Sequence, residues 1–527
     1  MMDELKALLF SKGLLELLPT LSCKIAFQIS DIVKLKIYFS SLVVKDEMIF
    51  FMGKNEEDNK KYLGIIVTAD KNFLLNDFTE CFRSGQITSL NACWKIYSLN
   101  NINATNLRKY LSFLSPCLIG KGKSIGCGDR LGISTPGHIM AVNNTDFFPI
   151  LAQQSIREMK RTGRTAVEVM DDAMWGVFQQ GFRKGFGSDG DHLKTIDDID
   201  YCLKAGFTLY TLDSGDYLDN EVDEIEFLEI EKKYFNLPWQ SLKIKPLELE
   251  KKYVNKTFSL PNGYSLSFNK EDFLKISVRY GKALVHILSV YNHLCSKKLL
   301  SEFEFEISVD EVDFSTTILE HFFIANELQR LGVKWLSLAL RFIGKFEKGV
   351  DYIGDIKSFE KSLKEHLSVV KYFGSYKLSF HSSSDKFSIY PCIGREVEDS
   401  VHFKTAGTTY LEALRTISIL EPNLFNEILL FAIKNYENDR KSYHVSADLN
   451  KVNSVSKIKN NELVKLLDNF DVRQVLHVTF GSVLTASNEN GNFYLKNEML
   501  KVLKNNEEKY YEILSFHIRR HIEAFKK

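Results

Sequence analysis

Strand-like and helix-like segments alternate along the middle of the chain, and this alternation restricts the possible folds more than any other feature. Short apolar segments typical of buried strands occupy residues 148–152, 207–213, 303–309, 333–339, 376–381 and 401–404. Helical periodicity appears at residues 155–182, from 196, at 316–330 and 356–373, and from 411. Six or more β/α units of this size predict an α/β fold, most economically a TIM-type (β/α)8 barrel. A doubly wound open sheet is the competing arrangement.

The 527 residues are too many for one small core, so other parts must accompany the barrel. We expect an N-terminal flanking α+β domain at residues 1–115, where no cluster of catalytic residue types occurs. Its strand-like segments lie at residues 24–30, 37–44 and 62–68.

The catalytic barrel is expected to occupy residues 116–440 and to contain an insertion. An acidic stretch at 216–231 and a basic stretch at 243–256 interrupt the alternation, which indicates a helical insertion at about 214–300. Residues 441–527 are expected to form a C-terminal, mainly helical extension.

Charge and cysteine content exclude several classes of protein. Lysine plus arginine equals aspartate plus glutamate at 68 each, so nothing indicates a nucleic-acid or membrane partner. The N-terminus lacks the basic and apolar regions of a signal peptide, and no apolar run approaches the ~20 residues of a membrane span. The eight cysteines form no CxxC pair and are expected to be reduced. We therefore expect a cytoplasmic protein.

Glycines crowd the stretch between residues 120 and 137, but two phosphate-binding motifs fail there. A P-loop ending at Lys123-Ser124 would need glycine at position 117, where Cys117 stands. The dinucleotide fingerprint would need a third glycine at Leu131. The alternative is a substrate loop, Gly128-Asp-Arg-Leu-Gly132, that leads into Thr135-Pro-Gly-His138.

A second polar stretch, Phe186-Gly-Ser-Asp-Gly-Asp-His-Leu-Lys-Thr195, separates two helical segments and is expected to be a loop. A histidine beside an aspartate suits metal-assisted chemistry on a hydroxy-carbonyl compound, with His192 binding a divalent cation and Asp191 moving a proton. Asp189 is expected to stabilise the turn, and a solvated turn without chemistry is the alternative for the whole stretch.

Other candidate residues fall at or near the ends of the predicted strands. In TIM barrels the chemistry lies at the carboxyl ends of the strands. Residues of suitable type at these positions are Asp213, Asp310, Glu311, Arg341, His381 and His402. They are therefore expected to face one site together with His192.

Several of these segments, in the same order, resemble the tagaturonate epimerase family over residues 120–420. The resembling segments are Gly128-Asp-Arg-Leu-Gly132, Thr135-Pro-Gly-His138, Leu151-Ala-Gln-Gln-Ser-Ile-Arg157, Gly187-Ser-Asp-Gly-Asp-His-Leu-Lys-Thr195, Ser308-Val-Asp-Glu311, Phe346-Glu-Lys-Gly-Val-Asp-Tyr352, His381-Ser-Ser-Ser-Asp-Lys-Phe387 and Lys404-Thr-Ala-Gly-Thr408. Ser383 stands where the family usually has glycine, and Leu340 where it has proline, which affects expectations of substrate specificity more than of reaction type.

The resemblance implies a metal-dependent epimerase that interconverts D-tagaturonate and D-fructuronate, a small keto-hexuronate pair, by inverting carbon 4 in hexuronate catabolism. The carbon-4 proton is not adjacent to the carbonyl, so simple deprotonation is a poor route. A retro-aldol route breaks the bond between carbons 3 and 4 and re-forms it with inverted configuration. It requires a Lewis-acid cation, two proton carriers and a cationic group for the carboxylate.

The resemblance and the strand-end positions together predict roles for individual residues. The metal ligands are expected to be His192, His381 and His402, holding Zn, Mn, Co or Ni. Asp191 and Glu311 are expected to transfer protons, with Asp129 and Asp310 as reserves. The substrate-binding residues are expected to be Asp129, Arg130, Lys194, Arg341, Asp385, Lys386 and Lys404. For each histidine a structural role, and for each charged residue an ion pair, is the alternative.

His517 and His521 share a face of the last helix, and they are expected at the exposed surface because no predicted strand supports them. Two other functions stay open: a metal-dependent aldolase or ketose isomerase acting on a related sugar acid, and a sugar-binding protein without catalysis.

Overall fold

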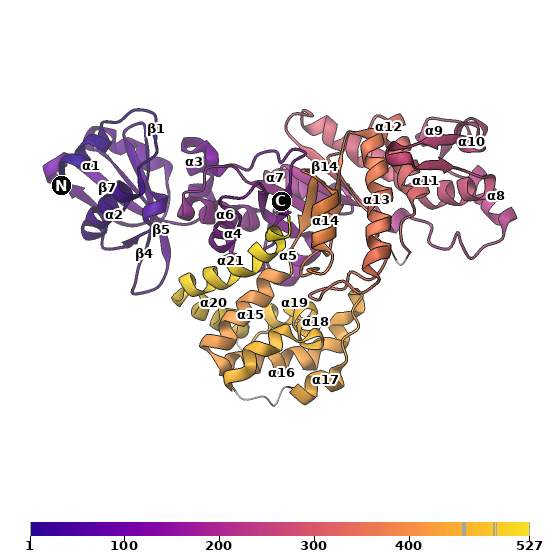
Figure 1. Ribbon diagram of the computed structural model, residues 1–527. Helices are drawn as coiled ribbons and strands as arrows, with labels where there is room; N and C mark the ends of the chain where they lie inside the picture. Colours follow the sequence, from indigo (N-terminus) through magenta and orange to yellow (C-terminus); the bar gives the residue numbers. More distant parts are fainter. Residues whose placement is uncertain (1, 313, 456–459, 489–490, 492, 526–527) are drawn as a thin grey trace.

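The computed structural model describes residues 2–312, 314–455, 460–488, 491 and 493–525. Its parts follow one another across the molecule (Figure 1): an N-terminal sheet lies at one end, a barrel in the middle and an insertion at the opposite end. Helices from the C-terminal part of the chain cover one side of the barrel. Among the described helices, none combines the length and apolar character needed to span a bilayer.

Eight parallel strands close into a barrel, which confirms the predicted TIM-type fold. In ring order they are β10 (Gly187–Leu193), β11 (Leu209–Asp213), β14 (Glu304–Ser308), β15 (Ser337–Ala339), β16 (Lys377–Phe380), β17 (Val401–Lys404), β8 (Ser124–Gly126) and β9 (Phe148–Ser155). The six strands predicted from apolar segments are all present.

The two remaining strands correct the sequence prediction: β10 lies in a stretch that was expected to be a loop, and β8 lies in the glycine-rich stretch, where no strand was predicted. Polar side chains on β10 are buried inside the barrel, where they pair with other strands: the carboxylate of Asp189 is fully buried and accepts a bond from Lys404 on β17. A Cβ on Gly126 of β8 would lie 1.8 Å from the side-chain oxygen of Gln153 on β9. Both strands therefore lack the apolar pattern by which strands are recognised.

Helices surround the barrel, most of them where helical periodicity was predicted, whereas the helices at 135–142 and 390–396 were not predicted. They are α4 (Thr135–Val142), α5 (Ile156–Thr162), α6 (Ala166–Gln180), α7 (Ile196–Lys204), α12 (Ile318–Arg330), α13 (Ile356–Phe373), α14 (Tyr390–Glu396) and α15 (Thr408–Leu420). Capping boxes at Thr165, Thr195 and Thr317 satisfy free backbone N–H groups and define the start of α6, α7 and α12.

Antiparallel strands form the N-terminal sheet. It contains β1 (Leu14–Leu15), β2 (Lys36–Ile37), β3 (Val43–Lys45), β4 (Met48–Lys54), β5 (Lys61–Thr68), β6 (Cys81–Ile87) and β7 (Ala92–Ser98), with α1 (Met2–Leu9), α2 (Pro19–Val33) and α3 (Asn101–Tyr110) beside it. The strand predicted at 24–30 is wrong, because these residues lie in α2. Pro19 starts that helix, and Ile25, Ile29 and Val33 are buried at helical spacing.

The insertion connects β11 to β14. It contains α8 (Phe227–Phe235), α9 (Trp239–Leu242), α10 (Pro246–Tyr253), the hairpin of β12 (Thr257–Ser259) and β13 (Ser265–Ser267), and α11 (Lys270–Lys297). After α15 the chain forms α16 (Pro422–Asp439), α17 (Leu449–Val455), α18 (Phe470–Val478), α19 (Phe480–Thr485), α20 (Tyr494–Asn505) and α21 (Glu507–Glu523). Helix α21 packs against α4 and α15, so the end of the chain lies on the barrel.

Candidate active site

Three potential metal ligands meet at the carboxyl ends of the barrel strands. His192 lies on β10, Asp310 follows β14 and His381 follows β16, and one ligand atom of each lies within 4.8 Å of the others. His381 Nδ1 lies 3.1 Å from Asp310 Oδ1. The group is referred to below as the His192 triad.

Carboxylates behind the two imidazoles determine which ring nitrogens face the centre of the triad. His192 Nδ1 donates to Asp191 Oδ1 at 2.8 Å, and His381 Nε2 donates to Glu306 Oε1 at 2.7 Å. A carboxylate can only accept, so these ring nitrogens are the donors, and the other nitrogen of each ring is left to face the centre of the triad, as in metal-bound histidines.

The triad fits a divalent cation on its own geometry. His381 Nδ1 is buried, receives no hydrogen bond from any residue that the structure describes, and faces a carboxylate. Burial opposes protonation of His192, but the neighbouring Asp191 carboxylate outweighs burial and raises the pKa of His192 to about 10. His381 Nδ1 and Asp310 Oδ1, 3.1 Å apart, favour positive charge between them, and the Asp310 carboxylate raises the pKa of His381 although burial opposes this. Two imidazoles and a carboxylate suit Zn, Mn, Co or Ni.

His402 does not belong to the triad, although it was predicted to be the third ligand. It lies two residues before the end of β17, where its Nδ1 is 3.0 Å from Ser124 Oγ on the neighbouring strand β8. Burial lowers the pKa of His402 to about 3, so its ring is neutral. The structure places Asp310, the reserve proton carrier of the prediction, where His402 was expected.

Lys404 lies at the centre of the barrel mouth and cross-links three strands. Its Nζ is 2.6 Å from Asp191, 2.8 Å from Asp189 and 2.8 Å from Glu306, and it also donates to Thr211 Oγ1 at 2.7 Å. Burial opposes protonation of the amine, but these carboxylates raise the pKa of Lys404 well above its usual value. Its Nζ is engaged by these partners, and the expected contact of Lys404 with a substrate carboxylate stays a prediction.

Both aspartates of β10 are buried inside the barrel. Asp189 is not a turn residue: it is fully buried, and burial raises its pKa to about 6. Asp191 was expected to act as a base. Burial raises its pKa, but His192 and Lys404 outweigh burial and hold the pKa well below the usual range. Asp191 therefore orients the imidazole of His192.

Comparison with known proteins decides the family. A model of the tagaturonate epimerase family matches residues 38–525. The chain belongs to the tagaturonate epimerase family. A tagaturonate/fructuronate epimerase of Thermotoga maritima is 40% identical over 488 residues, which cover 93% of this chain and 96% of that protein. The resemblance stated from the sequence motifs is confirmed.

Solved structures of the same family share the whole fold. The fructuronate-tagaturonate epimerase of Cohnella laeviribosi, in a structure complexed with one glycerol, has a TM-score of 0.87 and 34% identity over 95% of this chain and 98% of that one. Its native structure has a TM-score of 0.86 and 34% identity over 95% and 99%. As a member of this family the chain is an epimerase, an isomerase of carbohydrate metabolism.

A pocket lies beside the triad, and several of the residues that line it were not predicted from the sequence as site residues. They are Gln153 at the end of β9, Arg157 and Glu158 on α5, Lys348 after β15, Tyr443, and His477 on α18. Arg157 and Lys348 lie within segments that resemble the tagaturonate epimerase family, and this position was the signal that could have identified them as site residues. His477 lies on a helix outside the barrel, where no strand-end pattern applies. Of the predicted residues, Asp191, His192, His381, Arg130 and Lys404 line this pocket.

Glu311 lies at the edge of the triad. Its Oε1 is 3.6 Å from His192 Nε2 and 3.6 Å from Arg157 Nη2. Burial raises the pKa of Glu311, but His192 and Arg157 outweigh it, so the net shift is downward.

The other predicted substrate-binding residues have partners within the protein. Lys194 is paired with Asp216 at 2.8 Å, and Asp129 accepts the backbone N–H groups of its own loop. Lys386 is buried and donates to backbone carbonyls, including Glu347 O at 2.8 Å; burial lowers its pKa to about 7. Arg341 lines a small adjoining cavity beside Asp310 and His381.

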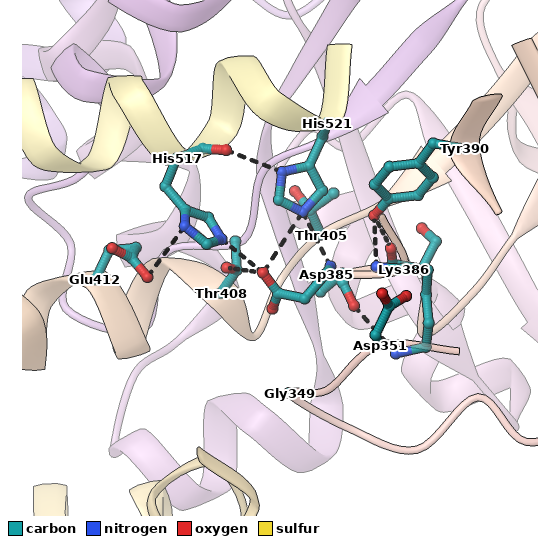
Figure 2. A network of polar contacts seen from close by, with 12 residues as sticks. Gly349, Asp351, Asp385, Lys386, Tyr390, Thr405, Thr408, Glu412, His517 and His521 are labelled. Atoms are coloured by element: carbon teal, nitrogen blue, oxygen red, sulfur yellow. Dashed lines mark hydrogen bonds and ion pairs between the residues drawn. The ribbon is translucent and has the colours of Figure 1, made fainter. Parts of the chain in front are cut away.

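His517 and His521 are buried, so the prediction that they lie at the exposed surface is wrong. Figure 2 shows both rings, from α21, directed toward Asp385 in the loop after β16. His517 Nε2 donates to Asp385 Oδ1 at 2.5 Å, and His521 Nε2 accepts the backbone N–H of Asp385 at 3.0 Å. Helix α21 packs on the barrel through the face that carries both histidines, so this face is buried.

These three residues could in principle ligate a metal, but their contacts indicate a structural role. Arg473 Nη2 donates to Asp385 Oδ2 at 2.8 Å, and His517 Nδ1 lies 3.3 Å from Glu412 Oε1 (Figure 2). The lone pair of His521 Nε2 is already in use. The Asp385 carboxylate is neutralised within the protein, so the group attaches the last helix to the loop that begins at His381.

His517→Ala is expected to lower the free energy of unfolding by about 1–3 kcal/mol, because the buried carboxylate of Asp385 loses a donor. Urea denaturation followed by circular dichroism measures the change. The control is His293→Ala, whose Nε2 pairs with the more exposed Asp200 at 2.7 Å and should contribute less than about 1 kcal/mol. Equal effects of the two substitutions would contradict the structural role of His517.

Proposed function

We propose that this chain interconverts D-tagaturonate and D-fructuronate in hexuronate catabolism, at a divalent cation held by the His192 triad. The observation that supports this most directly is the pair of potential ligand atoms, His381 Nδ1 and Asp310 Oδ1, that face each other at 3.1 Å beside the pocket of a tagaturonate epimerase family member. A divalent cation bound there would supply Lewis-acid polarisation of the substrate's keto and hydroxyl oxygens.

Inversion at carbon 4 by a retro-aldol route needs groups that move the carbon-4 hydroxyl proton. We assign this role to Glu311, whose carboxylate lies at the edge of the triad and is 34% exposed. Lys348 is the second carrier, because burial lowers the pKa of its amine and its Nζ donates to Ser382 Oγ inside the pocket. Asp191, which was predicted as the base, is assigned the orientation of His192.

Arg157 and Lys404 support these steps without moving protons. Arg157 Nη2 lies 3.6 Å from Glu311 and favours its carboxylate form, which is the form that accepts a proton. Lys404 holds Asp191 and Glu306, the two carboxylates that orient the imidazoles of the triad. The chain thereby presents the triad in one fixed geometry.

The decisive experiment incubates the purified protein with D-tagaturonate and a panel of Zn, Mn, Co and Ni salts and follows D-fructuronate by chromatography. Formation of the epimer supports the proposal. Accumulation of a free aldehyde fragment instead would identify an aldolase, and binding without conversion under every metal would identify a sugar-binding protein.

Removal of the cation provides a separate prediction. Dialysis against a chelator is expected to reduce the conversion rate by at least about 100-fold, because Lewis-acid stabilisation is worth several kcal/mol. Adding back one of the four metals should restore it. Metal content is measured on the dialysed protein. Full conversion by protein that holds less than about 0.1 ion per chain would contradict a metal-dependent reaction.

A further inference from the structure

The pocket contains a buried arginine with a free donor. Arg130 is 4% exposed, and its Nε and Nη2 both donate to Glu158 Oε1, at 2.8 and 2.6 Å. Its guanidinium lies 3.6 Å from the centre of the Phe480 ring. Nη1 is buried and has no hydrogen-bond partner within the described ranges. Buried donors are nearly always satisfied, so Nη1 is available to a ligand.

A histidine from outside the barrel lines the same pocket. His477 is 3% exposed, and its Nδ1 is buried without a hydrogen-bond partner in the part of the chain that the structure describes. Burial lowers its pKa well below the usual value, so the ring is neutral and offers one N–H donor and one acceptor.

Gly407 makes room for this ring. A Cβ on Gly407 would lie 1.9 Å from His477 Cε1. The backbone of Gly407 is in the right-handed helical region, which any residue adopts, so the ring of His477 is the reason that only glycine fits. The motif Lys404-Thr-Ala-Gly-Thr408 therefore includes one residue whose role is to admit His477.

Ring order places Arg130 and His477 beside strands other than those of the triad. Arg130 follows β8, which is four strands away from β14 and Asp310 in the eight-stranded ring. His477 packs against Gly407, which follows the adjacent strand β17. The strands that carry or precede the triad, β10, β14 and β16, thus lie in one part of the ring, and β17 and β8, beside which His477 and Arg130 lie, follow in the other.

We propose that Arg130 Nη1 and His477 bind the carboxylate of the substrate and retain it while the bond between carbons 3 and 4 is open. This inference rests on the proposed function. The carbon-4 hydroxyl proton passes to the base, carbon 4 becomes an aldehyde, and the electron pair of the broken bond moves into an enediolate of carbons 1–3. Carbons 4–6 form a three-carbon aldehyde acid that carries the carboxylate.

Retention of the carboxylate explains how an epimer, and not two fragments, is formed. With carbon 6 held, rotation about the bond between carbons 4 and 5 presents the opposite face of the aldehyde. The enediolate then attacks that face, its electron pair re-forms the bond, and the proton returns to the carbon-4 oxygen. The same atoms are recovered, with only carbon 4 inverted.

Three substitutions test this subsite, and each leaves the triad intact. Arg130→Lys keeps a cation for Glu158 but removes Nη1, His477→Gln removes the imidazole, and Gly407→Ala displaces it. Each is expected to raise KM for D-tagaturonate about 10- to 100-fold, because a charge-assisted bond to the carboxylate is lost. The fraction of turnovers that release the aldehyde acid, trapped as a hydrazone and quantified by mass spectrometry, should also rise.

A neutral ketohexose that carries a hydroxymethyl group at carbon 6 provides the internal comparison. Its conversion should change less than about threefold in the variants, since it makes no charge-assisted bond there. Arg395→Gln, at a side chain that is 60% exposed, is the matched control and should leave both substrates unaffected.

The possible results distinguish failure of the carboxylate subsite from failure of the proposed function. If the wild type converts D-tagaturonate but all three correctly folded variants keep its KM, the subsite is wrong and the proposed function stands. Equal losses on the acid and the neutral sugar would indicate a structural role and also overturn the subsite. If the wild type forms no epimer with any metal, the proposed function fails and the subsite falls with it. Thermal melting identifies variants that do not fold, in which case the remaining two carry the test.

Discussion

His192→Ala is expected to fold but to retain no divalent cation, and its turnover of D-tagaturonate is expected to fall at least about 1000-fold, because the several kcal/mol of Lewis-acid stabilisation are lost. Substitution removes one of two imidazoles and leaves His381 and Asp310, which are too few to hold the ion against dialysis. Metal per chain is measured by mass spectrometry after dialysis, and turnover by chromatography of the epimer.

His402→Gln is the matched control, because it removes a buried imidazole from the same barrel. The ring of His402 contacts Ser124, and a glutamine can replace that hydrogen bond. This variant is expected to keep its metal and most of its turnover. The opposite result, loss of metal in His402→Gln and its retention in His192→Ala, would restore the ligand set expected from the sequence and exclude the His192 triad.

The position of His402 shows how far strand-end reasoning extends. Side chains two residues apart on a strand share a face and differ in depth by about 6–7 Å. His402 and Lys404 both face the interior of the barrel, so Lys404 reaches the mouth and His402 lies one layer below it. Sequence spacing identified the correct strand and face, but the depth of the layer depends on the register of eight strands.

The strands show the same limit. Segments such as 303–309 and 401–404 predicted strands because apolar residues alternate with polar ones along them, and the polar residues, among them Glu306 and Lys404, face the barrel interior. Strand β10 reads as a loop because it contains Gly187, Gly190 and two buried aspartates, and because the lysine that pairs with both aspartates, Lys404, lies more than 200 residues away. Local pattern cannot reveal a polar interior whose charges cancel only in three dimensions.

Residues from the C-terminal helices are the largest omission of the sequence-based site. His477 enters the pocket, and His517 attaches the last helix to the loop that begins at His381. Their partners are distant in sequence: Gly407 lies 70 residues before His477, and Asp385 lies 132 residues before His517. Spacing on a single helix could indicate only that His517 and His521 share a face, not what covers that face.

Lys404→Met is expected to lower the free energy of unfolding by about 3–5 kcal/mol, because breaking a buried ion pair leaves uncompensated charge. Asp189 is affected most: Asp191 keeps His192 and Glu306 keeps His381, whereas Asp189 retains only the hydroxyl of Thr211. Urea denaturation in the presence of a chelator measures the change without a contribution from bound metal. Turnover should be lost as well, since Lys404 holds the carboxylates that orient the triad.

The pH dependence and a second substitution separate this electrostatic effect from a packing defect. In the wild type burial already raises the pKa of Asp189 to about 6, and removal of the ammonium should raise it further. A carboxyl whose folded pKa is raised contributes stability when protonated and loses it as pH rises through the folded pKa. The deficit of Lys404→Met should therefore be larger at pH 8 than at pH 5. Adding Asp189→Asn should recover part of it at pH 8, whereas a deficit independent of both pH and Asp189 would show that the methionine merely packs badly.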